Sequence, residues 1–240
     1  MVDFYAPAPG ETAPPVPDGP ALCSGKEMRV LHNAFLWAYA EAPGLVRGAA
    51  AGDTRRSAVV GQWLADLDAT LHVHHQSEDE LLWDKLEQRA PSCALHVAQM
   101  RAHHAQVQEL LHEASPLLER WQVSGDPSDG EDLAVAYERM LDVLKVHLRR
   151  EVLEVVPVAE KTLTQREWNE VGEHSIGAIP KSRLMPQLGM LLANTEPTAR
   201  AEFFEGVPKP VQLLYRIVGR RQYARQYREL FPGRPVPATV

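Results

Sequence analysis

The sequence predicts an all-α protein: an antiparallel up-down four-helix bundle followed by a C-terminal helical extension. Two observations support this fold class. Between residues 25 and 160, apolar side chains recur at spacings of three and four, the period of an amphipathic helix, and nothing there resembles a strand. Turn-forming residues interrupt this pattern at intervals, so the segment divides into four long helices with short connections.

Breaks in the apolar pattern give approximate bounds for the predicted bundle helices: 26–43, 55–87, 93–112 with a continuation to 121, and 131–156. Three prolines are expected to limit them, because proline removes a backbone donor and clashes with the preceding turn. Pro43 is expected to bend or end the first helix, and Pro116 to break the continuation of the third. Pro157 is expected to end the fourth.

The remaining chain divides into a tail and an extension. Residues 1–24 are rich in proline and small side chains, so we predict a disordered tail before a bundle domain at 25–160. Residues 161–240 are predicted to form an extension that packs on the bundle. Thr164-Gln165-Arg166-Glu167 resembles a helix capping box, and shorter helices are expected at 183–194, 198–207 and 210–231.

The last predicted helix is basic and aromatic. Its stripe consists of Tyr215, Arg216, Arg220, Arg221, Tyr223, Arg225, Tyr227 and Arg228. Nucleic acid or a membrane would suit such a stripe. The alternative is that the tyrosines pack on the bundle while the arginines reach acidic bundle surfaces. The net charge of −7 favours this alternative, so we expect no nucleic-acid and no membrane partner.

Composition also bears on the cellular setting. No apolar run approaches the roughly 18–20 residues that a membrane span needs. The N-terminus lacks the charged and apolar regions of a secretory signal. Cys23 and Cys93 lie far apart and form no paired-cysteine motif, so a reducing, cytoplasmic setting with ordinary thiols is expected.

Histidines and carboxylates on the inner helix faces carry the functional prediction. His74 and Glu78 lie four residues apart on an apolar helix face, where both are costly unless they have a partner. A chance histidine cluster on a solvated helix is the simpler explanation for this one stretch. However, each of the four helices has one inward histidine, and two add a carboxylate at i+4. The predicted metal ligands are His32, His74, Glu78, His104, His147 and Glu151.

Four imidazoles and two carboxylates suit two iron ions that share the carboxylates, and manganese is an alternative. Zinc could also bind, although structural zinc prefers a closed four-ligand site. Whether three further side chains also ligate stays open: His75, His103 and Glu154. Asp79 is expected to pair with His75 four residues earlier. Tyr39, two turns above His32, either packs or reduces an oxidised intermediate.

The pattern His32, His74-x-x-x-Glu78, His104 and His147-x-x-x-Glu151 resembles the hemerythrin-like (HHE cation-binding) family. The strings HHQSEDELLW, AHHAQVQELL and VHLRREVLEVVP agree with this resemblance, which covers about residues 25–160. The chain beyond is similar to a tail of actinobacterial members. The resemblance implies a non-haem di-iron centre with an oxo or hydroxo bridge, handling dioxygen, hydrogen peroxide or nitric oxide.

The sequence departs from the oxygen-carrying hemerythrins at Gln108, where they have a histidine four residues after His104. The spacing from His147 to Glu151 is also shorter than theirs. Since glutamine is a poor iron ligand, an open position is expected, which favours catalase-like, peroxidase-like or oxidase-like chemistry over oxygen carriage. A sensor of oxygen, iron or nitric oxide and an oxidase of an organic substrate are the alternatives. The sequence does not indicate an oligomeric state.

Overall fold

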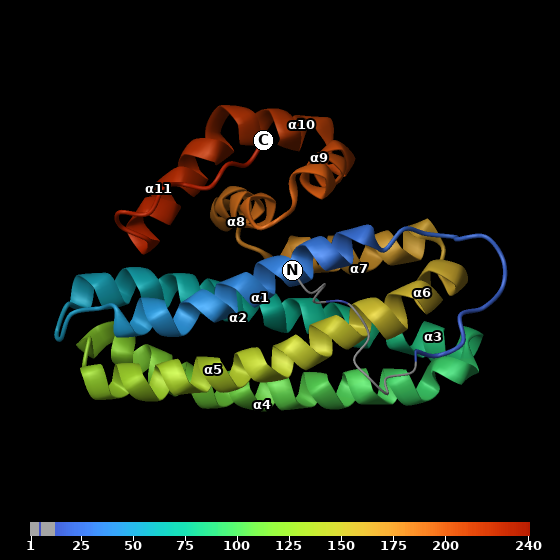
Figure 1. Ribbon diagram of the computed structural model, residues 1–240, viewed down its shortest axis with the longest axis horizontal. Coiled ribbons are helices and arrows are strands. Elements are labelled where there is room, and N and C mark those ends of the chain that lie inside the picture. Colours follow the sequence, from blue (N-terminus) through green and yellow to red (C-terminus); the bar gives the residue numbers. More distant parts are fainter. Residues whose placement is uncertain (1–4, 6–12) are drawn as a thin grey trace. The chain divides into compact units, whose positions relative to one another are not determined.

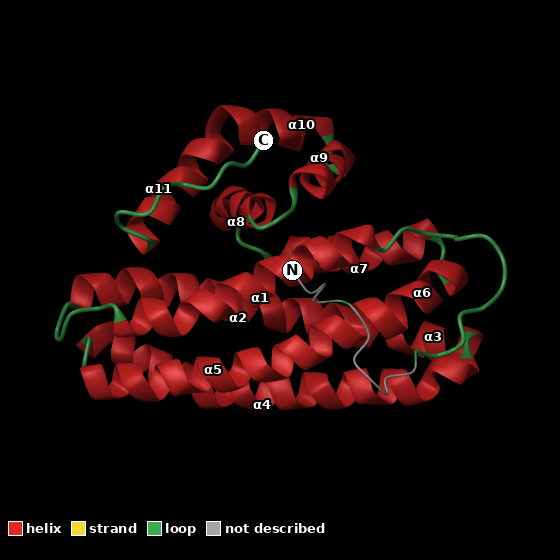
Figure 2. Ribbon diagram, in the orientation of Figure 1, coloured by secondary structure: helices red, strands yellow, loops and turns green. Residues whose placement is uncertain are grey.

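The computed structural model describes Tyr5 and residues 13–240, and within these residues it contains helices and loops but no strand (Figures 1 and 2). The four long helices are α1 (Lys26–Arg47), α2 (Thr54–Leu81), α4 (Ala94–Ser124) and α5 (Pro127–Arg150). Further helices follow towards the C-terminus. This architecture confirms the predicted all-α, four-helix bundle with a C-terminal helical extension. None of the described helices combines the length and the apolar character that spanning a bilayer requires.

Much of the predicted N-terminal tail, residues 1–4 and 6–12, lies outside the described residues. Residues 13–25 are loop and bend, with no helix. The end of this segment contacts α6 (Val156–Thr162), since the backbone N–H of Leu22 donates to the carbonyl of Glu160 at 2.7 Å. The amide of Gly25 donates to the Glu160 carboxylate at 2.8 Å.

Pro43 does not end its helix and Pro116 does not break its own, while a bend at Pro43, the other predicted outcome, stays a prediction. Pro43 lies inside α1 and Pro116 lies inside α4. Buried neighbours explain this outcome: Ala42, Leu45 and Val46 are almost fully buried beside Pro43. An interior proline costs a helix about 3 kcal/mol, and the burial of a helix face compensates for that cost.

The fourth helix also continues beyond its predicted end. After α5 comes a π-helical turn, η2 (Glu151–Val155), and then α6. Pro157 lies in the first turn of α6, directly after η2, so this proline is accommodated within a continuous helical segment and does not end it. The predicted second helix is likewise divided, because Leu82 separates α2 from α3 (Trp83–Arg89). A short 3₁₀ turn, η1 (Pro91–Cys93), leads into α4.

The C-terminal helices follow the predicted pattern closely. They are α7 (Gln165–Ala178), α8 (Lys181–Ala193), α9 (Pro197–Gly206), α10 (Lys209–Leu214), the π-helical turn η3 (Tyr215–Gly219) and α11 (Arg220–Leu230). The last three form one continuous helical segment, as the single predicted helix 210–231 requires. Prolines at the starts of α9 and near the start of α10 supply a fixed φ without losing a helical hydrogen bond.

The chain forms two compact units, and each takes part of the long helices. The first comprises the described residues up to Arg29, together with Asp68–Glu113 and Arg139–Ala178. Its apolar core includes Trp83, Leu86, Met100, Val155 and Trp168.

The second unit comprises Val30–Leu67, Ala114–Glu138 and Ile179–Val240. In it, Arg56 of α2 donates to the carbonyls of Glu229 and Leu230 at 2.5 and 2.6 Å, at the C-terminal end of α11. In this division, α7 belongs to the first unit and α8–α11 to the second. The predicted domain bounds stay predictions.

The capping box predicted at Thr164–Glu167 is present at the start of α7. The amide of Glu167 donates to Thr164 Oγ1 at 3.3 Å, and the amide of Thr164 donates to Glu167 Oε2 at 3.0 Å. Arg89 of α3 donates to both oxygens of the same carboxylate, at 2.6 and 2.8 Å. These hydrogen bonds, with that from Arg89 foremost, hold the pKa of Glu167 well below its ordinary value.

We expect Glu167→Ala to lower the free energy of unfolding at neutral pH by about 1 kcal/mol, the usual value of a helix cap. Because the folded-state pKa is depressed, the carboxylate stabilises the fold above its ordinary pKa of 4.5 and loses this effect as the pH falls below it. Urea unfolding of both proteins at about pH 7 and about pH 3 measures this, and the difference should shrink at the lower pH. A constant difference would contradict the ionic part of this account.

Candidate metal centre

Among the described residues, two groups of buried side chains could hold a metal ion. The first group is His32, His74, Glu78 and Glu151, from α1, α2 and η2. One ligand atom from each of these four residues lies within 4.8 Å of the others. All four residues were predicted ligands, and the structure brings them together.

The second group is His75, His104 and His147, from α2, α4 and α5, with ligand atoms again within 4.8 Å of one another. The His75 and His104 rings are stacked, with centroids 4.1 Å apart and planes 13° from parallel. His147 meets each of them edge-on at 4.8 Å. Three imidazoles therefore converge on one small volume.

The carboxylate of Glu78 faces both groups. Its Oε1 lies 3.4 Å from Nε2 of His74 in the first group, and its Oε2 lies 3.4 Å from Nε2 of His104 in the second. Glu151, also in the first group, has Oε2 at 3.7 Å from Nε2 of His147. Each carboxylate thus reaches histidines of both groups, which is the arrangement that two neighbouring cations sharing carboxylate ligands require.

Burial makes these two carboxylates costly in the metal-free protein. Desolvation raises the pKa of Glu78 well above its ordinary value, and the nearby Glu151 raises it further. Desolvation likewise raises the pKa of Glu151. A bound cation reverses this effect, because it favours the ionised form of a carboxylate.

Asp79 fixes the orientation of His104. Its Oδ1 accepts hydrogen bonds from His104 Nδ1 and from the indole Nε1 of Trp83, each at 2.8 Å. Burial alone would raise the pKa of Asp79, but these hydrogen bonds outweigh it and the net pKa is lowered. The predicted pairing of Asp79 with His75 is therefore wrong, because the side chain reaches across to α4 instead.

This pairing makes His104 suitable as a metal ligand. With Nδ1 donating to Asp79, the neutral imidazole presents a lone pair on Nε2 towards Glu78. Among the described residues, this buried Nε2 makes no hydrogen bond. An orphaned acceptor of this kind is costly unless a cation occupies the space in front of it. The donor set therefore fits a metal.

Comparison with known families gives the same indication. The model of the hemerythrin HHE cation-binding domain matches residues 26–159, more than half of the chain. The chain belongs to the hemerythrin HHE family. No curated protein and no solved structure matches it. In this structure, the HHE domain has buried clusters of histidine and glutamate that are suited to holding metal.

Two of the candidates left open lie outside both groups. Both carboxylate oxygens of Glu154 are engaged, by Arg150 at 2.9 and 3.0 Å and by His96 at 2.6 Å. The His103 ring lies beside that of His147, with centroids 5.7 Å apart, but His104 is the residue that joins the second group. The π-helical turn η2 helps to explain why Glu154 lies outside the groups. Such a turn shifts the side chains that follow Glu151 away from the face that they would occupy in an α-helix.

The third open candidate, His75, lies in the second group of the HHE domain. Helical periodicity left its role open, because adjacent helical residues point about 100° apart and only one follows the stripe of His74. With two groups side by side, however, adjacent residues can each face a different one. The adjacent pair His74-His75 is the feature of the sequence that could have indicated a place for His75 in the second group.

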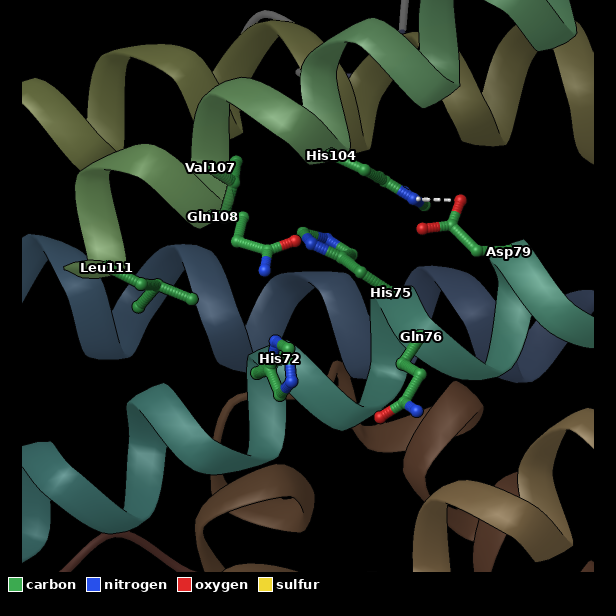
Figure 3. Close-up of a pocket in the computed structure, with 8 residues that line it drawn as sticks. All are labelled: His72, His75, Gln76, Asp79, His104, Val107, Gln108 and Leu111. Carbon is green, nitrogen blue, oxygen red and sulfur yellow. Dashed lines mark hydrogen bonds and ion pairs between the residues drawn. The ribbon is translucent and has the colours of Figure 1, made fainter.

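A pocket leads from the surface of the HHE domain to the second group (Figure 3). It has a volume of about 240 Å³ and lies between α2 and α4. His75, His104 and Val107 are its buried lining residues, and Gln108 extends towards His75 (Figure 3). His72 and Gln76 contribute exposed side chains to the lining. Gln108 therefore borders the path that a small molecule would take.

Tyr39 is fully buried in the second compact unit. Its ring packs against that of Tyr137, with centroids 5.9 Å apart. This contact agrees with the packing role, the simpler of its two predicted roles.

Proposed function

We propose that this HHE domain holds two iron ions and acts on a small oxidant: hydrogen peroxide, dioxygen or nitric oxide. Each ion would lie against one of the two ligand groups, and Glu78 and Glu151 would be shared between them. The observation that carries this proposal is the position of Glu78, whose two oxygens each lie 3.4 Å from a histidine of a different group. We also propose that the chain is of the actinobacterial type, and the resemblance of its C-terminal segment to that of actinobacterial members supports this proposal.

The donor set supports the choice of metal. Imidazole and carboxylate ligands suit iron or manganese, whereas structural zinc favours a closed site of four ligands. Bound iron would supply the electron transfer and Lewis acidity that reduction of such oxidants needs. The protein contributes the buried ligands, the hydrogen bond from His104 to Asp79, and the pocket that admits the oxidant.

The size of the pocket favours a small oxidant over an organic substrate. Its volume of about 240 Å³ lies below the range of roughly 300–1,000 Å³ of typical organic-ligand sites. The presence of Gln108 favours turnover of the oxidant over oxygen carriage. A histidine at this position would add an imidazole beside His75 and His104, whereas glutamine is a poor iron ligand and leaves that position open. We therefore favour catalase-like, peroxidase-like or oxidase-like chemistry for the HHE domain.

The test is elemental analysis of iron-reconstituted protein, with an optical spectrum before and after peroxide and the rate of peroxide loss. We expect about two irons per chain and absorption bands that change with peroxide. His74→Ala should lose metal and slow peroxide consumption, while His112→Ala, at an exposed histidine of α4, should behave as wild type. One zinc per chain, or no metal after reconstitution, would overturn the di-iron proposal, and equal peroxide loss in His74→Ala would overturn the catalytic one.

We expect Gln108→His to slow peroxide turnover about tenfold without lowering iron content, because the added imidazole would occupy a ligand position that catalytic sites keep open. Gln106→His is the matched control, since Gln106 is an exposed glutamine of α4 that does not line the pocket. Steady-state peroxide consumption and elemental analysis measure both variants. If Gln108→His turns over peroxide as fast as wild type, Gln108 does not border the reactive position.

A further inference from the structure

The C-terminal segment has an exposed surface that the metal centre does not explain. Four large aliphatic side chains lie within six residues on α10 and η3, with exposed fractions of 59%, 49%, 58% and 38%: Leu213, Leu214, Ile217 and Val218. The other exposed large hydrophobic residues of the described chain are separated from one another in the sequence. Isolated exposed apolar side chains are ordinary, but a contiguous patch indicates an interaction site.

Basic residues flank these aliphatic residues in the sequence. Residues 206–228 contain six basic side chains and no acidic one: Lys209, Arg216, Arg220, Arg221, Arg225 and Arg228. Arg216 stacks over the ring of Phe204, and Arg225 lies 3.9 Å from Glu229. Among the described residues, no ion pair involves Arg220, Arg221 or Arg228. We name the four aliphatic and six basic residues the basic–aliphatic surface.

The opposite side of this segment is anchored within the second unit. Tyr215, Tyr223 and Tyr227 are buried, while the predicted packing of these tyrosines on the bundle stays a prediction. Gly189 of α8 permits close approach to Tyr223, since a Cβ atom at Gly189 would lie 2.5 Å from its Cβ and Cγ atoms. The arginines, in contrast, are exposed, and their predicted contact with acidic bundle surfaces stays a prediction. The basic–aliphatic surface is therefore held outward on a packed support.

We propose that the basic–aliphatic surface docks on an anionic lipid bilayer. The aliphatic side chains would enter the boundary between headgroups and acyl chains, and the flanking cations would contact lipid phosphates. This proposal departs from the expectation based on net charge. Electrostatic interactions are screened beyond a Debye length of about 10 Å, so at contact the local cations outweigh the acidity of the whole chain.

Two other occupants fit this surface less well. Nucleic-acid backbones are bound by cationic and polar groups, so the aliphatic side chains would stay exposed to water. A second copy of the chain that docked patch to patch would bring the two sets of six cations together, which is unfavourable. A bilayer would contact both the aliphatic and the basic side chains of the surface.

The test is cosedimentation of the full chain with vesicles of phosphatidylcholine alone and with vesicles of phosphatidylcholine and phosphatidylglycerol in equal parts. We expect binding to the anionic vesicles, weakened by salt. Ile217→Ser and the double variant Arg220→Gln/Arg221→Gln should each reduce the partition coefficient by about tenfold. The matched controls are Ile176→Ser, whose side chain has the same exposed fraction of 58%, and Arg166→Gln, on the exposed side of α7.

Every substituted side chain is exposed, so folding should be unchanged, and circular dichroism checks this. No binding to anionic vesicles, or binding that neither variant weakens, would overturn the proposal. So would tighter binding to duplex DNA that needs the arginines but not Ile217, since a polyanion would then be the partner. A dimer in light scattering that Ile217→Ser converts to monomer would assign the surface to a second copy instead.

Discussion

Glu78→Gln is expected to abolish the paired metal site, lowering iron content from about two ions per chain to one or none. The carboxylate is fully buried and faces histidines of both ligand groups, so its loss affects both positions. Glutamine keeps the volume but is a poor iron ligand. Because burial raises the pKa of Glu78, its ionised form costs stability in the metal-free fold. The metal-free variant should therefore be at least as stable as wild type.

Thermal unfolding with and without iron separates metal loss from misfolding. A ligand at 100 times its dissociation constant stabilises a protein by about 2.7 kcal/mol, and Glu78→Gln should lose most of this gain. Glu154→Gln is the matched control, since Glu154 is also a buried glutamate but is held by Arg150 and His96. If Glu78→Gln retains two irons, or if Glu154→Gln loses them, the ligand assignment is incorrect.

Asp79→Asn is expected to weaken metal affinity by about 10- to 100-fold, the usual effect of removing the hydrogen-bond partner of a ligating histidine. Asp79 accepts from His104 Nδ1 at 2.8 Å and so keeps the Nε2 lone pair directed at Glu78. An uncharged amide holds the ring less firmly and lowers its basicity. Competition with a chromophoric chelator measures the affinity.

Two controls distinguish this positioning role from a general effect on the fold. Asp84→Asn makes the same change at an exposed aspartate that pairs with Arg101, and should not alter metal affinity. Trp83→Phe removes the other hydrogen bond to Asp79 but leaves His104 in place, so it should lower stability more than affinity. An Asp79→Asn protein that binds iron as tightly as wild type would show that His104 needs no such partner.

The fold class and the family were predictable from the amino-acid sequence, because both depend on local patterns. The three-and-four spacing of apolar residues places the bundle helices, and Thr164–Glu167 contains the capping box that starts α7. The i+4 pairs His74–Glu78 and His147–Glu151 needed nothing beyond helical periodicity to be placed on common faces. The structure places His74, Glu78 and Glu151 in the first buried group and His147 in the second, while their role as ligands stays a prediction.

Contacts between side chains of different helices could not be predicted, because they depend on how the helices pack. Helical periodicity within α2 suggested that Asp79 pairs with His75, but the carboxylate instead reaches His104 of α4. Pro43 does not end α1, since the burial of neighbouring side chains compensates for a local cost. His75 joins the second group because helices converge there from several directions, and no pattern within a single helix encodes that convergence.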